Sequence, residues 1–101
     1  MDINVILNEE ELEVTLEIAG EITINNFNEL STTIEKNMGK NIDFILDFSG
    51  VTYIDSAGIG GLVAKLKEIF NYGGNLKIIN TPSKILKLFR LTKLDKFFEI
   101  Y

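Results

Sequence analysis

A nearly continuous apolar segment, Ile42–Phe48, most constrains how this chain can fold. A strand that is apolar on both faces is typical of the interior of a covered sheet. An amphipathic segment follows the sequence DSAG, and a second strand pattern, Asn75–Ile79, comes after it. A strand–helix–strand unit of this kind predicts two parallel strands joined by a right-handed crossover.

Two further strand patterns precede this unit. Leu12–Ile18 alternates apolar and polar residues, which indicates a sheet with one buried face. Asn4–Asn8 is predicted to pair with it as a hairpin. Between these strands and the central unit, helical spacing predicts a helix that has Asn26 as its N-cap and ends at Gly39. The apolar residues with this spacing are Phe27, Leu30, Ile34 and Met38.

The remainder of the chain adds one helix and one strand. Thr81 and Pro82 are predicted to open the last helix as its N-cap and first residue. Phe97–Tyr101 is predicted to form a short final strand. The order is therefore β-β-α-β-α-β-α-β, which indicates one α/β domain over residues 1–101 with a mixed, mostly parallel sheet.

The composition excludes several classes of function. The 101 residues contain no histidine and no cysteine, which removes His-dependent nucleophilic catalysis and imidazole or thiolate metal sites. No cofactor is predicted. A pI near 4.6 argues against nucleic-acid binding. No apolar run reaches the roughly 18 residues of a membrane span, and the first residues do not resemble a signal peptide. The absence of cysteine fits a cytoplasmic protein.

The net charge of −5 is unevenly distributed along the chain. Residues 1–57 carry twelve acids and two bases, whereas residues 58–101 carry three acids and eight bases. Two interpretations are open: the charges cancel over the surface, or they form a dipolar surface that steers a partner. The first is favoured here, because halves of a sequence need not be halves of a structure.

The segment YIDSAGIGG, residues 53–61, is predicted to join the central strand to its helix. Sites in open α/β sheets lie at such carboxyl ends of strands. Asp55 or Ser56 is predicted to cap the helix. Glycine costs about 1 kcal/mol per position in a helix interior, so the three glycines of this segment need a reason. Clearance for the close approach of a partner is the reason we predict.

Enzymatic interpretations of this segment fail on its spacing. The P-loop, the dinucleotide-binding pattern and the nucleophile elbow are each incomplete around Ser56. A Ser–Lys pair with Lys65 or Lys93 stays open, so a small hydrolase or nucleotide-binding enzyme remains the least favoured alternative.

An exposed hydroxyl at a helix start suits a phosphoacceptor. A phosphate on Ser56 would meet free backbone N–H groups and the positive end of the helix dipole. It would also add a charge of about −1.5 to −2 at neutral pH, beside Asp55. The physical prediction is a switch that turns binding on and off.

Residues 45–80 closely resemble the signature of STAS domains, specifically those of bacterial anti-sigma factor antagonists. The resemblance continues through residues 81–101, which are similar to the closing helix of that family. It is looser near the start, where AGEIT, residues 19–23, is similar to a G-E-L-D strand end.

The resemblance implies a STAS-type fold and a partner-switching mechanism in transcription regulation. The unphosphorylated protein would bind an anti-sigma factor that is also a serine kinase, and so free a sigma factor. Phosphorylation of Ser56 would break the complex, and a phosphatase would reset it. The protein would be a substrate and binding module, with no catalytic or metal-ligating residues. The predicted partner-binding residues are Thr23, Asp55, Ser56, Ala57, Gly58, Ile59, Gly60 and Gly61.

Two departures from the family pattern affect these expectations. Thr23 stands where the family usually has an aspartate, at a strand end expected beside the serine loop. The chain stops at Tyr101, where many relatives carry one more helix. Either that helix is absent or the sequence is truncated, and an exposed apolar strip would then favour pairing with another chain. A monomer or weak dimer is expected. A STAS subunit of a sensory, stress or lipid-transport complex is the alternative function.

Overall fold

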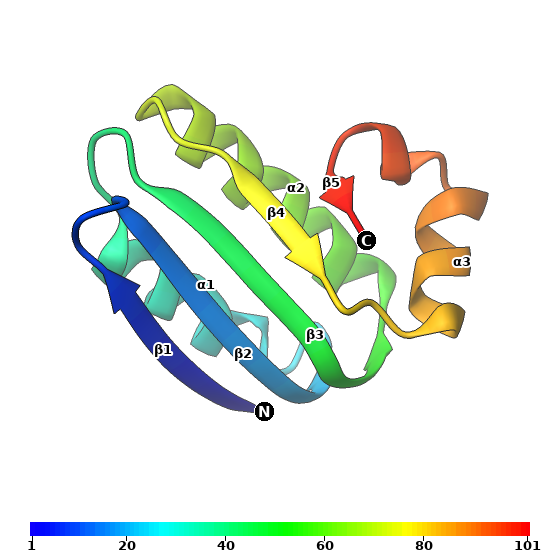
Figure 1. Ribbon diagram of the computed structural model, residues 1–101. Coiled ribbons are helices and arrows are strands. Elements are labelled where there is room, and N and C mark those ends of the chain that lie inside the picture. Colours follow the sequence, from blue (N-terminus) through cyan, green and yellow to red (C-terminus); the bar gives the residue numbers. More distant parts are fainter.

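A five-stranded sheet runs through the computed structural model, which describes residues 1–101 (Figure 1). The strands lie in chain order, with β1 antiparallel to β2 and every other neighbouring pair parallel. The predicted element order and the mixed, mostly parallel sheet are confirmed. The elements are β1 (Asp2–Asn8), β2 (Glu13–Ile22), α1 (Phe27–Asn37), β3 (Asp43–Ile54), α2 (Ser56–Asn71), β4 (Leu76–Ile79), α3 (Ser83–Leu91), a 3-10 turn η1 (Leu94–Lys96) and β5 (Glu99–Ile100).

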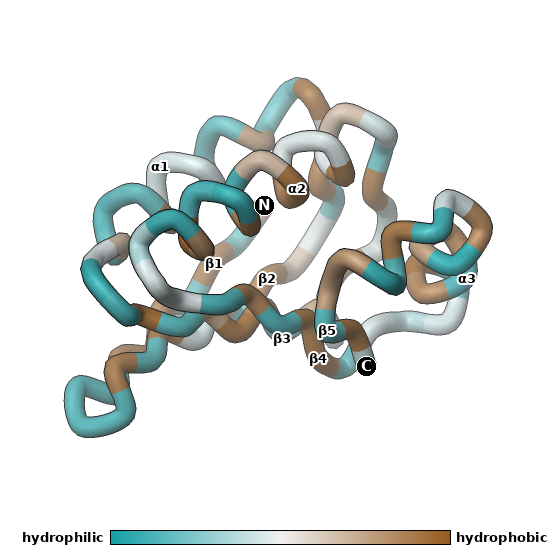
Figure 2. The backbone as a smooth tube through the Cα atoms, turned by 90° about the horizontal axis from the view of Figure 1, so that it is seen from above, coloured by the Kyte–Doolittle hydropathy of each residue, from teal (hydrophilic) through white to brown (hydrophobic).

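Helices α1 and α2 lie side by side on one face of the sheet, and α3 lies beside its β5 end (Figures 1 and 2). Strand alternation explains which face is covered. In β2, Val14, Leu16 and Ile18 are buried, whereas the residues between them are half-buried or exposed. The opposite face of the sheet carries no helix.

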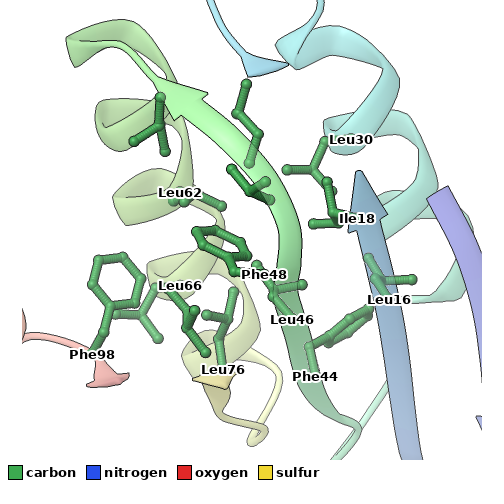
Figure 3. Packing of buried hydrophobic residues seen from close by; sticks show 14 of the residues in the cluster. Leu16, Ile18, Leu30, Phe44, Leu46, Phe48, Leu62, Leu66, Leu76 and Phe98 are labelled. Carbon is green, nitrogen blue, oxygen red and sulfur yellow. The ribbon is translucent and has the colours of Figure 1, made fainter. Parts of the chain in front are cut away.

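One hydrophobic core joins the sheet to its helices (Figure 3). Each large aliphatic or aromatic side chain that is fully buried stabilises the fold by about 1.5–3 kcal/mol. The core contains 20 buried residues from all three helices and from β2, β3 and β4, together with Phe98. Those labelled in Figure 3 are Leu16, Ile18, Leu30, Phe44, Leu46, Phe48, Leu62, Leu66, Leu76 and Phe98.

The strands next to the serine loop are longer than predicted. Strand β2 continues to Ile22 and β3 to Ile54, although the sequence patterns predicted ends at Ile18 and Phe48. The register explains the extension, because Ile22 pairs with Ile54 and both side chains are buried. Parallel pairing therefore carries both strands up to the start of α2.

Two helix starts differ from the predicted capping. Thr81 is not the N-cap of α3; Pro82 takes that place in an extended conformation. The reason is that the Thr81 N–H donates a hydrogen bond to the Tyr101 carbonyl at 2.9 Å, which keeps this segment beside β5. Asn26 is the N-cap of α1, but its side chain makes no capping bond; its Oδ1 accepts from the Thr23 N–H instead.

The charges are separated in space, so the favoured prediction that they cancel over the surface is wrong. Because the strands follow chain order, the acidic β1–β2 hairpin lies at one side of the molecule and α3 at the other (Figure 1). Glu9, Glu10 and Glu11 are exposed on the hairpin, and Lys84, Lys87 and Arg90 are exposed on α3. The halves of this sequence are largely halves of the structure.

Candidate functional site

Asp55 joins the start of α2 to the end of β2. Its Oδ1 accepts a hydrogen bond from the Gly58 N–H at 2.7 Å, which caps the helix. Its Oδ2 accepts from the Ile24 N–H at 3.0 Å, and its own N–H donates to the Ile22 carbonyl at 3.1 Å. One side chain therefore sets the geometry of two loops that are 31 residues apart in the sequence.

These bonds stabilise the ionised form of Asp55. The N–H of Gly58, followed by that of Ile24, lowers the pKa of this carboxyl below its usual value. A carboxylate that accepts backbone N–H groups is favoured in its charged form. Asp55 therefore carries its negative charge at neutral pH, directly before Ser56.

Ser56 is the first residue of α2, and its side chain is exposed. Asp55 makes the capping bond, so the Ser56 hydroxyl is not required for that role. No acidic residue lies in the first turn of the helix. The hydroxyl is thus accessible beside the positive end of the helix dipole, where an added anion is favoured.

Two of the three glycines in this segment make room for the protein itself. A Cβ atom on Gly58 would lie 2.7 Å from the Ile22 carbonyl oxygen and 3.0 Å from the Ile54 side chain. A Cβ atom on Gly61 would overlap the ring of Phe27. The prediction that these glycines give clearance to a partner is wrong for Gly58 and Gly61, because β2 and α1 fill the space.

Gly60 is the open glycine of the segment. It is exposed, and a Cβ atom there would meet nothing within 4 Å. Ile59, next to it, is only 6% exposed and belongs to the core. Gly58 is also buried. Neither Gly58 nor Ile59 is therefore available as contact surface, while the half-buried Ala57 lies between them and Ser56.

Thr23 lies at the end of β2, beside the serine loop as expected. Its neighbours Ile22 and Ile24 both hydrogen-bond to Asp55. The Thr23 side chain turns to its own loop, where its Oγ1 accepts from the Asn25 N–H at 3.3 Å. The structure therefore brings Thr23, Asp55 and Ser56 together at the carboxyl ends of the neighbouring strands β2 and β3.

Two apolar residues that the sequence patterns did not point to flank this site. Ile24 is 73% exposed and Tyr53 is 52% exposed, at the ends of the two strands that carry the site. One feature of the sequence could have identified Ile24: it is an apolar residue between a predicted strand and a predicted helix, and it fits neither the strand alternation nor the helical spacing. Large exposed apolar side chains around one polar group are typical of binding surfaces.

Lys65 is not placed to activate Ser56. Its Nζ donates hydrogen bonds to Glu35 Oε1 at 2.6 Å and to Glu68 Oε2 at 3.0 Å. It lies nine residues beyond Ser56 on the same helix, a rise of roughly 13 Å. Burial favours its neutral form, but the bonds to Glu35 and Glu68 outweigh burial and raise the pKa of Lys65. Lys65 is a charged link between α1 and α2.

No group of three or more acidic side chains is placed to hold a metal ion. The longest helix, α2, has 16 residues, and none of the helices combines the length and hydrophobicity needed to cross a lipid bilayer.

Comparisons with known proteins agree on one family. A model of the STAS domain matches residues 4–101. The chain is 30% identical over 100 residues to the anti-sigma-B factor antagonist of Bacillus subtilis (strain 168). The aligned residues make up 99% of this chain and 92% of that relative. A Thermotoga maritima crystal structure described as a candidate anti-sigma factor antagonist is 26% identical, with a TM-score of 0.86, over 98% of this chain and 85% of that one. The Bacillus cell fate determinant SpoIIAA in its phosphorylated form shares the fold, with a TM-score of 0.65 at 18% identity over 99% and 91% of the two chains.

Proposed function

The chain belongs to the STAS domain family, and from that premise we propose that it is an anti-sigma factor antagonist switched by phosphorylation of Ser56. The observation that carries the proposal is the accessible Ser56 hydroxyl at the start of α2, with Asp55 making the capping bond. Capping by a neighbour allows Ser56 to be modified while the helix keeps its N-terminal hydrogen bond.

The proposed cycle uses an anti-sigma factor that is also a serine kinase. The unphosphorylated antagonist binds this partner, and a sigma factor is released. The Ser56 Oγ then attacks the γ-phosphorus of ATP, ADP leaves, and a base on the kinase takes the hydroxyl proton. A phosphatase later hydrolyses the phosphoserine. ATP and sigma factors place this cycle in the cytoplasm, with the antagonist as substrate rather than enzyme.

The added charge supplies the switch in this proposal. Phosphoserine carries about −1.5 to −2 charges at neutral pH, next to the ionised Asp55. Covering these charges with the partner removes them from water, which costs free energy unless cations face them. Complex formation is therefore weakened, while the helix dipole tolerates the phosphate in the free antagonist.

The proposed contact surface differs from the one predicted from the sequence by four residues. It keeps the six predicted residues that are at least partly exposed: Thr23, Asp55, Ser56, Ala57, Gly60 and Gly61. It omits the buried Gly58 and Ile59 and adds Ile24 and Tyr53. In this proposal the two exposed apolar side chains bury area against the partner, and Gly60 lets its backbone come close.

Phosphorylation by the cognate kinase tests the acceptor. Incubation with that kinase and ATP, followed by peptide mass spectrometry, is expected to locate the phosphate on Ser56. Ser83 is a matched control, because it is also exposed and is also the first residue of a helix. Ser56→Ala should bind the kinase without being phosphorylated, and Ser83→Ala should be phosphorylated on Ser56 as the wild type is. Phosphate on another residue of the wild type would overturn the proposal.

The contact surface has its own matched pair of variants. Ile24→Ala is expected to weaken kinase binding by roughly tenfold, a central cost for an apolar interface anchor. Leu91→Ala, on α3, removes a side chain of nearly equal exposure, 72% against 73%, and should leave the affinity unchanged. Calorimetric titration measures the affinity of each variant for the kinase. Equal affinities for the two variants would show that Ile24 is not part of the contact surface.

A further inference from the structure

Strand β1 leaves an open edge on the sheet. All seven of its residues, Asp2–Asn8, pair with β2 on one side. On the other side no strand follows, and β1 lies at the outer edge of the molecule (Figure 1). None of the backbone hydrogen bonds outside regular helices and strands involves residues 2–8. The outward N–H and C=O groups of β1 are therefore free to pair with another strand.

The side chains of β1 do not protect this edge. Proteins commonly block edge strands with lysine, proline, a bulge or a covering element. Here Asp2 is the one charged residue of β1, and the pairing of β1 with β2 contains no bulge. Instead, Val5 is 38%, Ile6 47% and Leu7 57% exposed. Leu7 also lines a groove at the end of the hairpin, whose other apolar residues are Leu12, Val14 and Ile42 and whose charged residues are Glu9, Glu13 and Lys36.

We infer that β1 pairs antiparallel with β1 of a second copy, about a two-fold axis at Val5. This register pairs all seven residues of each strand. Val5 faces Val5 of the other copy, and Ile3 faces Leu7, all on the side of the sheet that carries the helices. Asn4 faces Ile6 on the opposite side. The pairing continues the sheet across the two copies and buries apolar side chains against each other.

Charge is compatible with this register and limits its strength. Asp2 faces the amide of Asn8, so no like charges lie directly opposite each other. However, the acidic halves of both copies approach, since residues 1–57 hold twelve of the fifteen acids. One strand per copy is also a small contact beside a standard interface, which buries about 1,200–2,000 Å². The dimer is weak and is strengthened by salt, which screens the repulsion.

Single cysteines test the register, because the chain has no cysteine of its own. Residues directly opposite in antiparallel strands are about 4.5–5.5 Å apart at Cα, which a disulfide can bridge. Two copies of Val5→Cys should therefore cross-link under mild oxidation. Two copies of Ile6→Cys are diagonal neighbours at about 7–8 Å, beyond the usual reach. Leu91→Cys, on α3 at 72% exposure, is the control for random collision.

Val5→Cys is expected to cross-link roughly tenfold faster than either control, because pairing raises the effective thiol concentration. Equal rates for the three variants would overturn the inference. Sedimentation equilibrium of the unmodified chain should show reversible dimers that strengthen from low to high salt and are lost in Val5→Lys but not in Leu91→Lys. Dimers that weaken with salt would also overturn the inference. Salt weakens attraction between opposite charges, so such dimers would join the acidic hairpin of one copy to the basic α3 of the other. The outcome does not depend on phosphorylation of Ser56.

Discussion

Gly60 and Gly61 are neighbours in the first turns of α2, but only one of them has room for a methyl group. Gly60→Ala meets open space and is expected to raise the free energy of unfolding by up to about 1 kcal/mol, through helix propensity. Gly61→Ala must displace the Phe27 ring and should lower it by about 1–3 kcal/mol. Urea unfolding measures both, and a Gly61→Ala variant as stable as Gly60→Ala would contradict the close contact with Phe27.

Asp55 should make stability depend on pH in acid. Its pKa in the folded protein is lowered by the N–H groups of Gly58 and Ile24. Such a carboxylate stabilises the fold above its unfolded pKa, about 3.9, and this contribution is lost as pH falls through the lower folded pKa. The stability advantage over Asp55→Asn should therefore be full at neutral pH and shrink below about pH 4. An advantage that is constant across this range in urea unfolding would show that these bonds do not favour the ionised form.

Helices α1 and α2 are joined by the ion pair between Lys65 and Glu35, and Lys65 also pairs with Glu68 of its own helix; the Lys65 side chain is only 7% exposed. Glu35→Gln or Glu68→Gln alone should lower the free energy of unfolding only slightly, because the other carboxylate still pairs with Lys65 and exposed ion pairs contribute little. The double variant leaves the ammonium without a carboxylate, at a cost of about 1–3 kcal/mol. A double-mutant cycle in urea checks this, and strictly additive costs would show that the two carboxylates act independently.

The molecule should unfold as one unit, because every helix contributes to the same core. Even the last elements are included: Phe89 of α3 and Phe98 meet edge to face, with ring centroids 5.6 Å apart. Phe48→Ala is expected to lower the free energy of unfolding by about 3–5 kcal/mol while keeping a single transition. Circular dichroism and tyrosine fluorescence should give coincident curves in both proteins. Separate transitions would indicate that α3 and β5 unfold on their own.

The elements of this fold were predictable because apolar periodicity is a local property of the chain. The alternation in β2 and the helical spacing in α1 identified both elements correctly. Strand ends were less predictable, since β2 reaches Ile22 only because Ile54 pairs with it. The prediction that Thr81 is the N-cap of α3 was wrong for a similar reason. The Thr81 N–H donates to the Tyr101 carbonyl, 20 residues away, and this bond holds Thr81 beside β5.

The sequence by itself determined the element order, the strand-to-helix turn before α2, and a hydroxyl and a carboxylate at the start of that helix. These features depend on neighbouring residues. Only the tertiary structure decided what the glycines accommodate, that Asp55 also holds Ile24, and that the charges lie at opposite sides. Those outcomes depend on contacts between segments that are far apart in the chain, and local periodicity does not encode which segments meet.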